Sequence, residues 1–101
     1  MDDVISLLID KLRAYKPEKV IIFGSQVNGM SRPDSDIDLA IIKKTDQPFF
    51  RRSGEVRKIL RSKIPLDVFV FTPDEYNQAV RTNLLVSEIE STGRVVYEAA
   101  N

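Results

Sequence analysis

The sequence predicts an α/β (α+β) fold in which helices pack against a small mixed β-sheet, as a single domain over residues 1–101. Segments with helical spacing and short apolar runs follow one another in the order α-β-α-β-α-β-α-α-β, which is typical of a mixed sheet covered by helices. The strand expected at residues 36–42 is apolar on both faces beyond its aspartates, so it should be central. With 101 residues, the chain can bury a real but small core.

The first part of the chain is expected to form a helix and then two strands joined by a turn. Asp2 or Asp3 can cap the first helix, which should end near Tyr15 because Pro17 disfavours helical backbone at the preceding residue. The elements expected after it are a strand over residues 19–23, a turn and short helix over residues 24–29, a loop over residues 30–35 and a strand over residues 36–42.

The second part of the chain is expected to form three helices and two strands. The expected ranges are a helix over residues 49–62, a strand over residues 66–71, helices over residues 73–80 and 84–90, and a strand over residues 94–97. Thr72 predicts a sharp helix start, because Pro73 suits the first helical position and Glu75 can complete a capping box. Thr82 or Asn83 should separate the last two helices.

The helix over residues 49–62 is rich in Arg and Lys. The side chains expected to be buried are Phe49, Val56, Ile59 and Leu60. The basic side chains, which we interpret as a solvated face, are Arg51, Arg52, Arg57, Lys58, Arg61 and, just beyond the expected helix, Lys63. The alternative is that this face docks an acidic partner or a triphosphate.

The composition excludes several classes of protein and of site. Fifteen basic and 15 acidic residues give zero net charge, which argues against a general nucleic-acid-binding protein. The absence of cysteine and histidine excludes disulfides, thiolate metal sites, histidine zinc ligands and Ser-His triads. Carboxylates therefore remain the main candidates for acid–base or metal chemistry. No apolar run approaches the ~20 residues that span a bilayer, and Asp2 and Asp3 are unlike a signal peptide, so we expect a cytoplasmic protein without membrane contact.

The candidate site lies in the stretch VIIFGSQVNGMSRPDSDIDLAII over residues 20–42. Gly24 ends the first expected strand, where a residue without a Cβ lets the backbone turn sharply and approach a ligand. Ser25 can cap the short helix that follows, and the unpaired N–H groups of a helix start suit a phosphate. Asp36 and Asp38 are two residues apart on a strand, so they point to the same face. Such carboxylates suit Mg²⁺ bound together with substrate phosphates, and the alternative is a solvated loop end.

Asp67 is a third candidate, because it interrupts the apolar run Leu66-Asp67-Val68-Phe69-Val70-Phe71. Strand alternation places Asp67 on one face with every second residue after it. If the strands that carry Asp38 and Asp67 are neighbours, the three aspartates converge. The alternative is a solvated aspartate at the start of an edge strand, near Pro65.

The pattern Gly24-Ser25, ten residues and Asp36-Ile37-Asp38 resembles the signature of the polymerase-β-like nucleotidyltransferase superfamily. The short length resembles the minimal nucleotidyltransferases (MNT), which are often encoded beside a HEPN-domain protein. The resemblance implies a nucleotidyltransferase fold with catalytic and metal-binding roles for Asp36, Asp38 and Asp67. The nucleotide-binding residues that it implies are Gly24, Ser25, Gly29 and Ser35. One departure is Asn28, where the common minimal form has arginine.

The resemblance also implies a reaction and a partner. The implied reaction is Mg²⁺-dependent transfer of AMP from ATP to a protein hydroxyl, with two Mg²⁺ ions. The implied acceptor is a HEPN-type toxin, which would make this chain the antitoxin of a toxin–antitoxin system, and oligomerisation stays open. Two alternatives are a weak or inactive module that neutralises a HEPN-type partner by binding alone, and an enzyme that modifies antibiotics or other small molecules. The chain offers no second domain to shape a small-molecule site, which favours the protein acceptor.

Overall fold

A computed structural model of the protein describes residues 2–24, 37–61 and 66–100. Within these ranges, four strands form one sheet in the order β3-β2-β1-β4. The strands are β1 (Lys19–Phe23), β2 (Ile37–Ile42), β3 (Leu66–Phe71) and β4 (Arg94–Glu98). The β2–β3 pair is parallel and the other two pairs are antiparallel, so the sheet is mixed as predicted.

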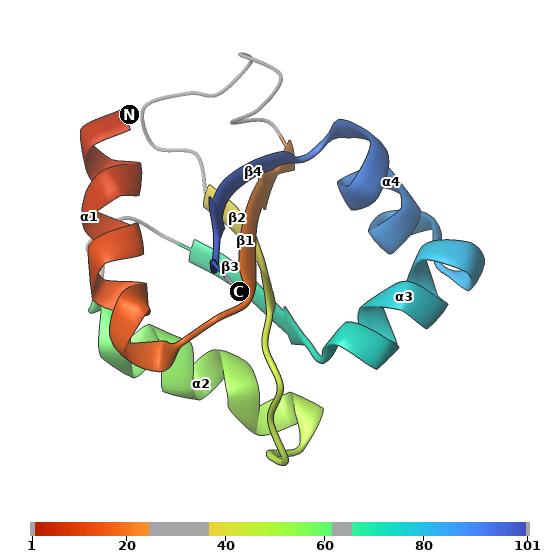
Figure 1. Ribbon diagram of the computed structural model, residues 1–101, viewed down its shortest axis with the longest axis horizontal. Coiled ribbons are helices and arrows are strands. Elements are labelled where there is room, and N and C mark those ends of the chain that lie inside the picture. The colour runs from red at the N-terminus through yellow and green to blue at the C-terminus, as the bar shows by residue number, and fades with distance from the viewer. Residues whose placement is uncertain (1, 25–36, 62–65, 101) are drawn as a thin grey trace.

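Helices cover both faces of this sheet and make three layers (Figure 1). The helices are α1 (Asp2–Leu12), α2 (Phe49–Leu60), α3 (Pro73–Thr82) and α4 (Leu84–Thr92), and a short 3₁₀ turn, η1 (Arg13–Tyr15), extends α1. Figure 1 shows α1 and α2 on one face, with α3 and α4 on the other. In the described part of the chain, none of the helices has the length and apolar content needed to cross a membrane.

The core consists of two apolar layers, one on each face of the sheet. The layer under α1 and α2 takes its strand residues from alternate positions: Val20, Ile22, Ile37, Leu39, Ile41, Leu66, Val68 and Val70. The layer under α3 and α4 takes the positions between them: Ile21, Phe23, Ala40, Ile42 and Phe71, packed against Tyr76, Val86 and Ile89. Strand β2 is therefore central, as its apolar pattern predicted, and the structure shows that helices cover both of its faces.

The helix starts and stops agree with their local sequence. The Thr72 side chain accepts a hydrogen bond from the Glu75 N–H at 3.2 Å, and the Glu75 carboxylate accepts one from the Thr72 N–H at 2.8 Å, so the predicted capping box is confirmed. Asn83 ends α3, and its side-chain oxygen accepts a hydrogen bond from the Val86 N–H at the start of α4. One residue therefore provides the predicted break between the two helices.

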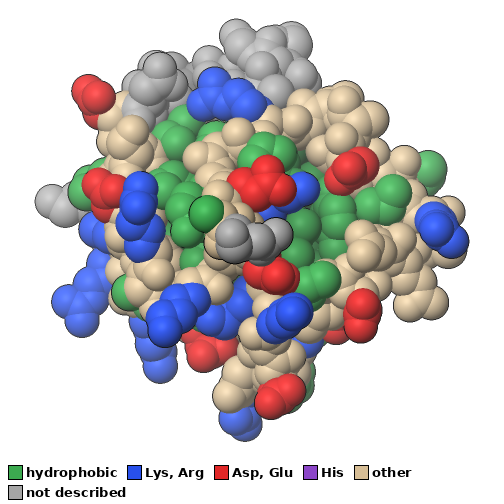
Figure 2. All heavy atoms as spheres, in the orientation of Figure 1, with side chains coloured by type: hydrophobic (Ala, Val, Ile, Leu, Met, Phe, Trp, Pro, Cys, Tyr) green, Lys and Arg blue, Asp and Glu red, His purple; other side chains and the backbone are tan. Residues whose placement is uncertain are grey.

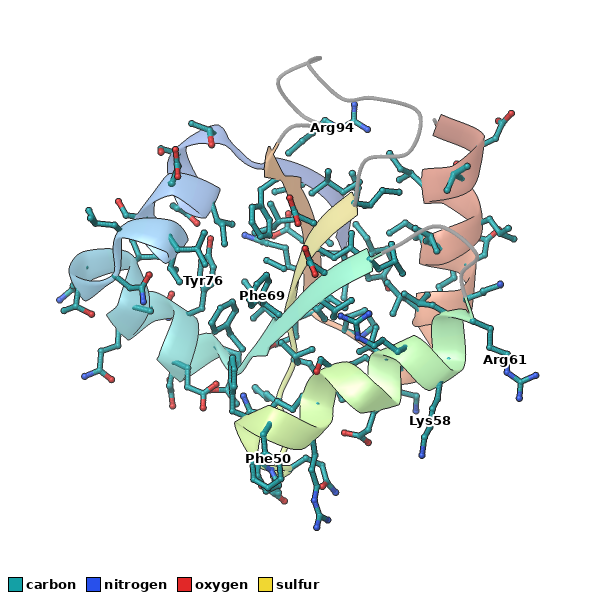
Figure 3. The ribbon with its side chains drawn as sticks, turned by 180° about the vertical axis from the view of Figure 1, so that it is seen from behind. Phe50, Lys58, Arg61, Phe69, Tyr76 and Arg94 are labelled. Atoms are coloured by element: carbon teal, nitrogen blue, oxygen red, sulfur yellow. The ribbon has the colours of Figure 1, made fainter. Side chains whose placement is uncertain are left out.

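Charged side chains of both signs are interspersed over the face drawn in Figure 2, as expected for a chain with zero net charge. Phe50 and Lys58 on α2, and Arg61 directly after its end, point away from the body of the protein (Figure 3). This agrees with the solvated basic face expected for that helix.

The buried set predicted for α2 is wrong in two places. Arg52, expected on the solvated face, is only 5% exposed, whereas Phe49, expected in the core, is 52% exposed. The Arg52 guanidinium donates to the backbone oxygens of Gln47 and Val70 and makes two hydrogen bonds, of 2.6 and 3.2 Å, to the Glu75 carboxylate. A buried arginine needs such partners, and Glu75 lies 23 residues away, so helix periodicity alone could not identify this position.

We predict that Arg52→Met destabilises the protein by about 2–4 kcal/mol at pH 7, because it removes the donor to two backbone carbonyls and to Glu75. Arg57→Met is the matched control, since Arg57 is exposed on the same helix. It should change stability by no more than about 0.5 kcal/mol. Urea unfolding of wild type and the two variants measures both effects. Equal losses of unfolding free energy in the two variants would contradict the structural role of the buried Arg52.

The same contact predicts a pH dependence. The hydrogen bond from Arg52 is the main reason that the pKa of Glu75 lies below its ordinary value. A carboxyl group with a lowered folded-state pKa contributes stability above its ordinary pKa and loses that contribution as the pH falls through the lowered value. The stability difference between wild type and Arg52→Met should therefore shrink in acid.

Candidate active site

Two of the three predicted catalytic aspartates lie side by side at one end of the sheet. In the parallel β2–β3 pair, Asp38 is the register partner of Asp67, and across the antiparallel β1–β2 pair it is the partner of Phe23. Asp38 precedes Ala40 by two residues, so it lies on the face that α3 and α4 cover, and Asp67 lies on that face with Phe69. The strands that carry the two aspartates are therefore neighbours, which was the condition for their convergence.

The two carboxylates differ in exposure. Asp38 is half-buried, whereas Asp67 is exposed at the start of β3. A solvent-facing carboxylate beside a half-buried one leaves an open side from which a ligand can approach. Asp36 and the predicted nucleotide-binding residues Ser25, Gly29 and Ser35 lie outside the described residues, so the structure places only Gly24, Asp38 and Asp67 from the predicted site.

Gly24 is required at its position for two separate reasons. Its φ of +82° lies in the left-handed region that residues with a side chain rarely adopt. A Cβ on Gly24 would also lie 2.3 Å from Asp38 Oδ2. Within the described residues, the group that lies closest to the missing Gly24 Cβ is the Asp38 carboxylate, and the approach of a ligand to this backbone stays a prediction.

The described residues suit a divalent cation. Two carboxylates at matched register repel each other unless a positive group joins them, and a site built only of oxygen ligands favours a hard cation such as Mg²⁺. Asp38 and Asp67 could supply two such ligands; within the described ranges, no group of three or more potential metal-binding side chains assembles. The described pair matches the one or two carboxylates with which Mg²⁺ is held beside substrate phosphates.

A cavity of about 180 Å³ adjoins Gly24 on the face covered by α4. Its lining residues are Phe23, Gly24, Leu85, Glu88, Ile89 and Thr92. Phe69 reinforces the Phe23 wall, with ring centroids 6.0 Å apart, and points into the space between the sheet and the α3–α4 layer (Figure 3). No pattern in the sequence marks the α4 residues as part of a site, because only the packing of α4 on β1 brings them beside Gly24.

A larger cavity of about 270 Å³ lies at the opposite end of β1 and β2, beside Lys19 and Ile42. The Tyr76 hydroxyl donates to Glu90 Oε2 at 2.7 Å there. Burial, followed by this hydrogen bond, raises the pKa of the Tyr76 hydroxyl above its ordinary value. This cavity and the aspartate pair lie at opposite ends of β1 and β2, so the cavity is not part of the candidate site.

Comparison with known proteins gives consistent results. A family model described as "Polymerase beta, Nucleotidyltransferase" matches residues 7–101. A protein of Methanocaldococcus jannaschii named "Putative protein adenylyltransferase MJ0141" is 29% identical over 92 residues, which cover 90% of this chain and 85% of that protein. The sequence match therefore extends over nearly the whole chain.

Solved structures of similar fold are also found. A toxin–antitoxin crystal structure with AMP-PNP superposes with a TM-score of 0.62 and 22% identity, covering 93% of this chain and 73% of that chain. A crystal structure of a mutant toxin–antitoxin MntA-HpeT superposes with a TM-score of 0.54 and 23% identity, covering 97% and 72%. These likenesses confirm the fold that the sequence predicted.

We predict that Gly24→Ala destabilises the protein by about 1–2 kcal/mol, because alanine is strained at a positive φ. The added Cβ should also displace the Asp38 carboxylate. The matched control is Gly54→Ala, since Gly54 lies within α2 and a Cβ there meets nothing within 4 Å. That control should gain about 0.5–1 kcal/mol from helix propensity. The melting temperature should fall in Gly24→Ala and rise in Gly54→Ala. A Gly24→Ala protein more stable than wild type would contradict the left-handed conformation of Gly24.

We predict that Asp67→Asn leaves the stability of the metal-free protein unchanged or raises it, since it relieves repulsion with Asp38. If local hydrogen bonds to Asp67 instead supported the fold, the same change would cost about 1–3 kcal/mol. Thermal melts in EDTA distinguish the two cases. Asp46→Asn, an exposed change away from the strands, controls for the loss of one negative charge.

Proposed function

The chain belongs to the polymerase β nucleotidyltransferase family, and from this membership we propose that it transfers AMP from ATP to a hydroxyl group of a protein partner. The observation that carries the proposal is the Asp38–Asp67 register pair beside Gly24. In a family that transfers nucleotides, this pair is the group of described side chains suited to hold a metal–nucleotide complex.

The proposed reaction is an in-line displacement at the α-phosphorus of ATP. The acceptor hydroxyl oxygen forms a new bond to that phosphorus, the bond to the β-phosphate bridging oxygen breaks, and pyrophosphate leaves. The hydroxyl proton passes to a base, and we assign this role to Asp67 because its carboxylate is exposed toward the open side of the pair.

Asp38 and Asp67, together with Asp36 from the predicted motif, would hold Mg²⁺. When bound, Mg²⁺ supplies charge stabilisation for the attacking and leaving oxygens. The half-buried Asp38 fixes the position of the pair, because its carboxylate lies against the Gly24 backbone. Ser25 keeps its predicted role of holding the outgoing β- and γ-phosphates, and Gly24, Gly29 and Ser35 keep theirs as nucleotide-binding residues.

The acceptor and the partner follow from the similar proteins. The name of the Methanocaldococcus jannaschii relative supports a protein acceptor, and the toxin–antitoxin structure with AMP-PNP supports an adenine nucleotide and a toxin partner. We propose that the chain is a cytoplasmic antitoxin that adenylylates a HEPN-type toxin. The sequence resemblance to the MNT group supports the HEPN assignment.

Incubation of the protein with α-labelled ATP, Mg²⁺ and the HEPN-type protein of the neighbouring gene tests the proposal. We expect label on the partner, and no label when ATP carries it on the γ-phosphate. EDTA should stop the transfer. Asp38→Asn should slow it by about 100-fold or more, because a neutral amide binds Mg²⁺ more weakly than a carboxylate and several kcal/mol of transition-state stabilisation are lost. Asp46→Asn, exposed and outside the site, should transfer at the wild-type rate.

Other outcomes point to other functions. Tight association with the partner without label would support neutralisation by binding alone. Label on a hydroxyl group of an antibiotic or another small molecule, and none on protein, would support the small-molecule alternative. Either result would overturn the proposed protein adenylylation.

A further inference from the structure

The cavity beside Gly24 contains an acceptor group to which no role is yet assigned. We propose that this cavity receives the purine base of the nucleotide and that Glu88 accepts a hydrogen bond from the exocyclic amino group of the base. Glu88 would then determine nucleotide specificity. This inference rests on the proposed function, since it places the base of the same nucleotide.

The position of the cavity fits a base. Gly24 forms part of its wall and also lies against the Asp38 carboxylate, so the cavity and the aspartate pair share one backbone segment. In a nucleotide the ribose alone separates the α-phosphate from the base. A nucleotide whose α-phosphate lies at Asp38 and Asp67 therefore has its base within a few bonds of this cavity.

The shape and polarity of the walls also fit a base. The volume of about 180 Å³ lies below that of pockets for drug-sized ligands, so the cavity suits a small flat group such as a purine base. Apolar side chains face the space from both sides, with Phe23 and Ile89 in the core and Leu85 42% exposed on α4. A flat ring between them would cover Leu85, and purine faces pack well on aromatic and aliphatic surfaces.

The polar groups select for a hydrogen-bond donor. The Thr92 hydroxyl donates to the Glu88 backbone oxygen at 2.8 Å, so its hydrogen is already used within α4. In the described part of the chain, the Glu88 carboxylate makes no hydrogen bond or ion pair. An ionised carboxylate only accepts hydrogen bonds. It therefore favours a base that presents an amino group and repels one that presents a carbonyl oxygen at the same place.

Two matched pairs of nucleotides isolate this contact. ATP differs from purine riboside triphosphate only by the 6-amino group, and GTP differs from ITP only by the 2-amino group. The readout is displacement of a fluorescent ATP analogue from the Mg²⁺-loaded protein without any acceptor. We expect the amino-bearing member of one pair to bind about ten-fold more tightly to wild type, as for a hydrogen bond to a charged group in a partly open cavity. A difference within the ATP pair supports the proposed adenine nucleotide, whereas a difference within the GTP pair alone would overturn the assignment of ATP as the donor.

Variants of Glu88 assign the difference to its carboxylate. Glu88→Ala should bring the ratio within the pair close to one, and Glu88→Gln, which keeps an acceptor without the charge, should restore part of it. Glu55→Ala is the control, because Glu55 is exposed on α2, on the opposite face of the sheet. Loss of a negative charge raises the affinity for every triphosphate. This general gain cancels in the ratio of the two affinities within a pair, so the ratio reports the contact with the amino group alone.

The outcomes distinguish this inference from the proposed function. Equal binding within both pairs in wild type, or an unchanged ratio in Glu88→Ala, would overturn the role of Glu88 while nucleotide binding itself still supports the proposed function. Failure of every triphosphate to bind would overturn both. Occupation of the cavity by a partner side chain instead of a base would give equal binding within the pairs.

Discussion

The register of the parallel β2–β3 pair is the constraint on which the candidate site depends. It places Asp38 opposite Asp67, while Leu39 and Val68, one residue further on, pair on the opposite face. A slip of one residue would move Asp67 to the face under α1 and α2 and would bring Val68 to the α4 side. The apolar alternation of both strands opposes such a slip. A slipped strand would turn the side chains of each core layer toward the other face of the sheet.

The same constraint brings two carboxylates to partner positions in neighbouring strands, and like charges at such positions repel each other. The surrounding structure holds them nonetheless: Gly24 adopts a left-handed conformation that leaves room for the Asp38 carboxylate. Local departures of this kind, a positive φ and adjacent carboxylates, are typical of functional sites, where packing elsewhere compensates for them. Their coincidence at one end of the sheet is the structural reason to place the chemistry there.

The helices on the α4 side depend on contacts between distant parts of the chain. Arg52 joins α2 to the Glu75 carboxylate at the start of α3, and Asn83 ends α3 and begins α4. Through these contacts the orientation of α4 is linked to the edge of the sheet at β3. Leu85 and Glu88 lie beside Gly24 because α4 packs against β1, so the proposed base cavity is a product of tertiary packing.

The sequence by itself determined the local features of this protein. Alternation and helical spacing located the strands to within a residue of their described limits, and the Thr72–Glu75 capping box was readable because both partners lie within one helical turn. The Gly24 and Asp38 positions were recognisable because their spacing matches a known motif. Only the tertiary structure decided which strands are neighbours, that Arg52 is buried, and that Glu88 faces a cavity beside Gly24. Each of these depends on contacts between residues far apart in the chain, and periodicity within a single element carries no information about the partner that will lie against it.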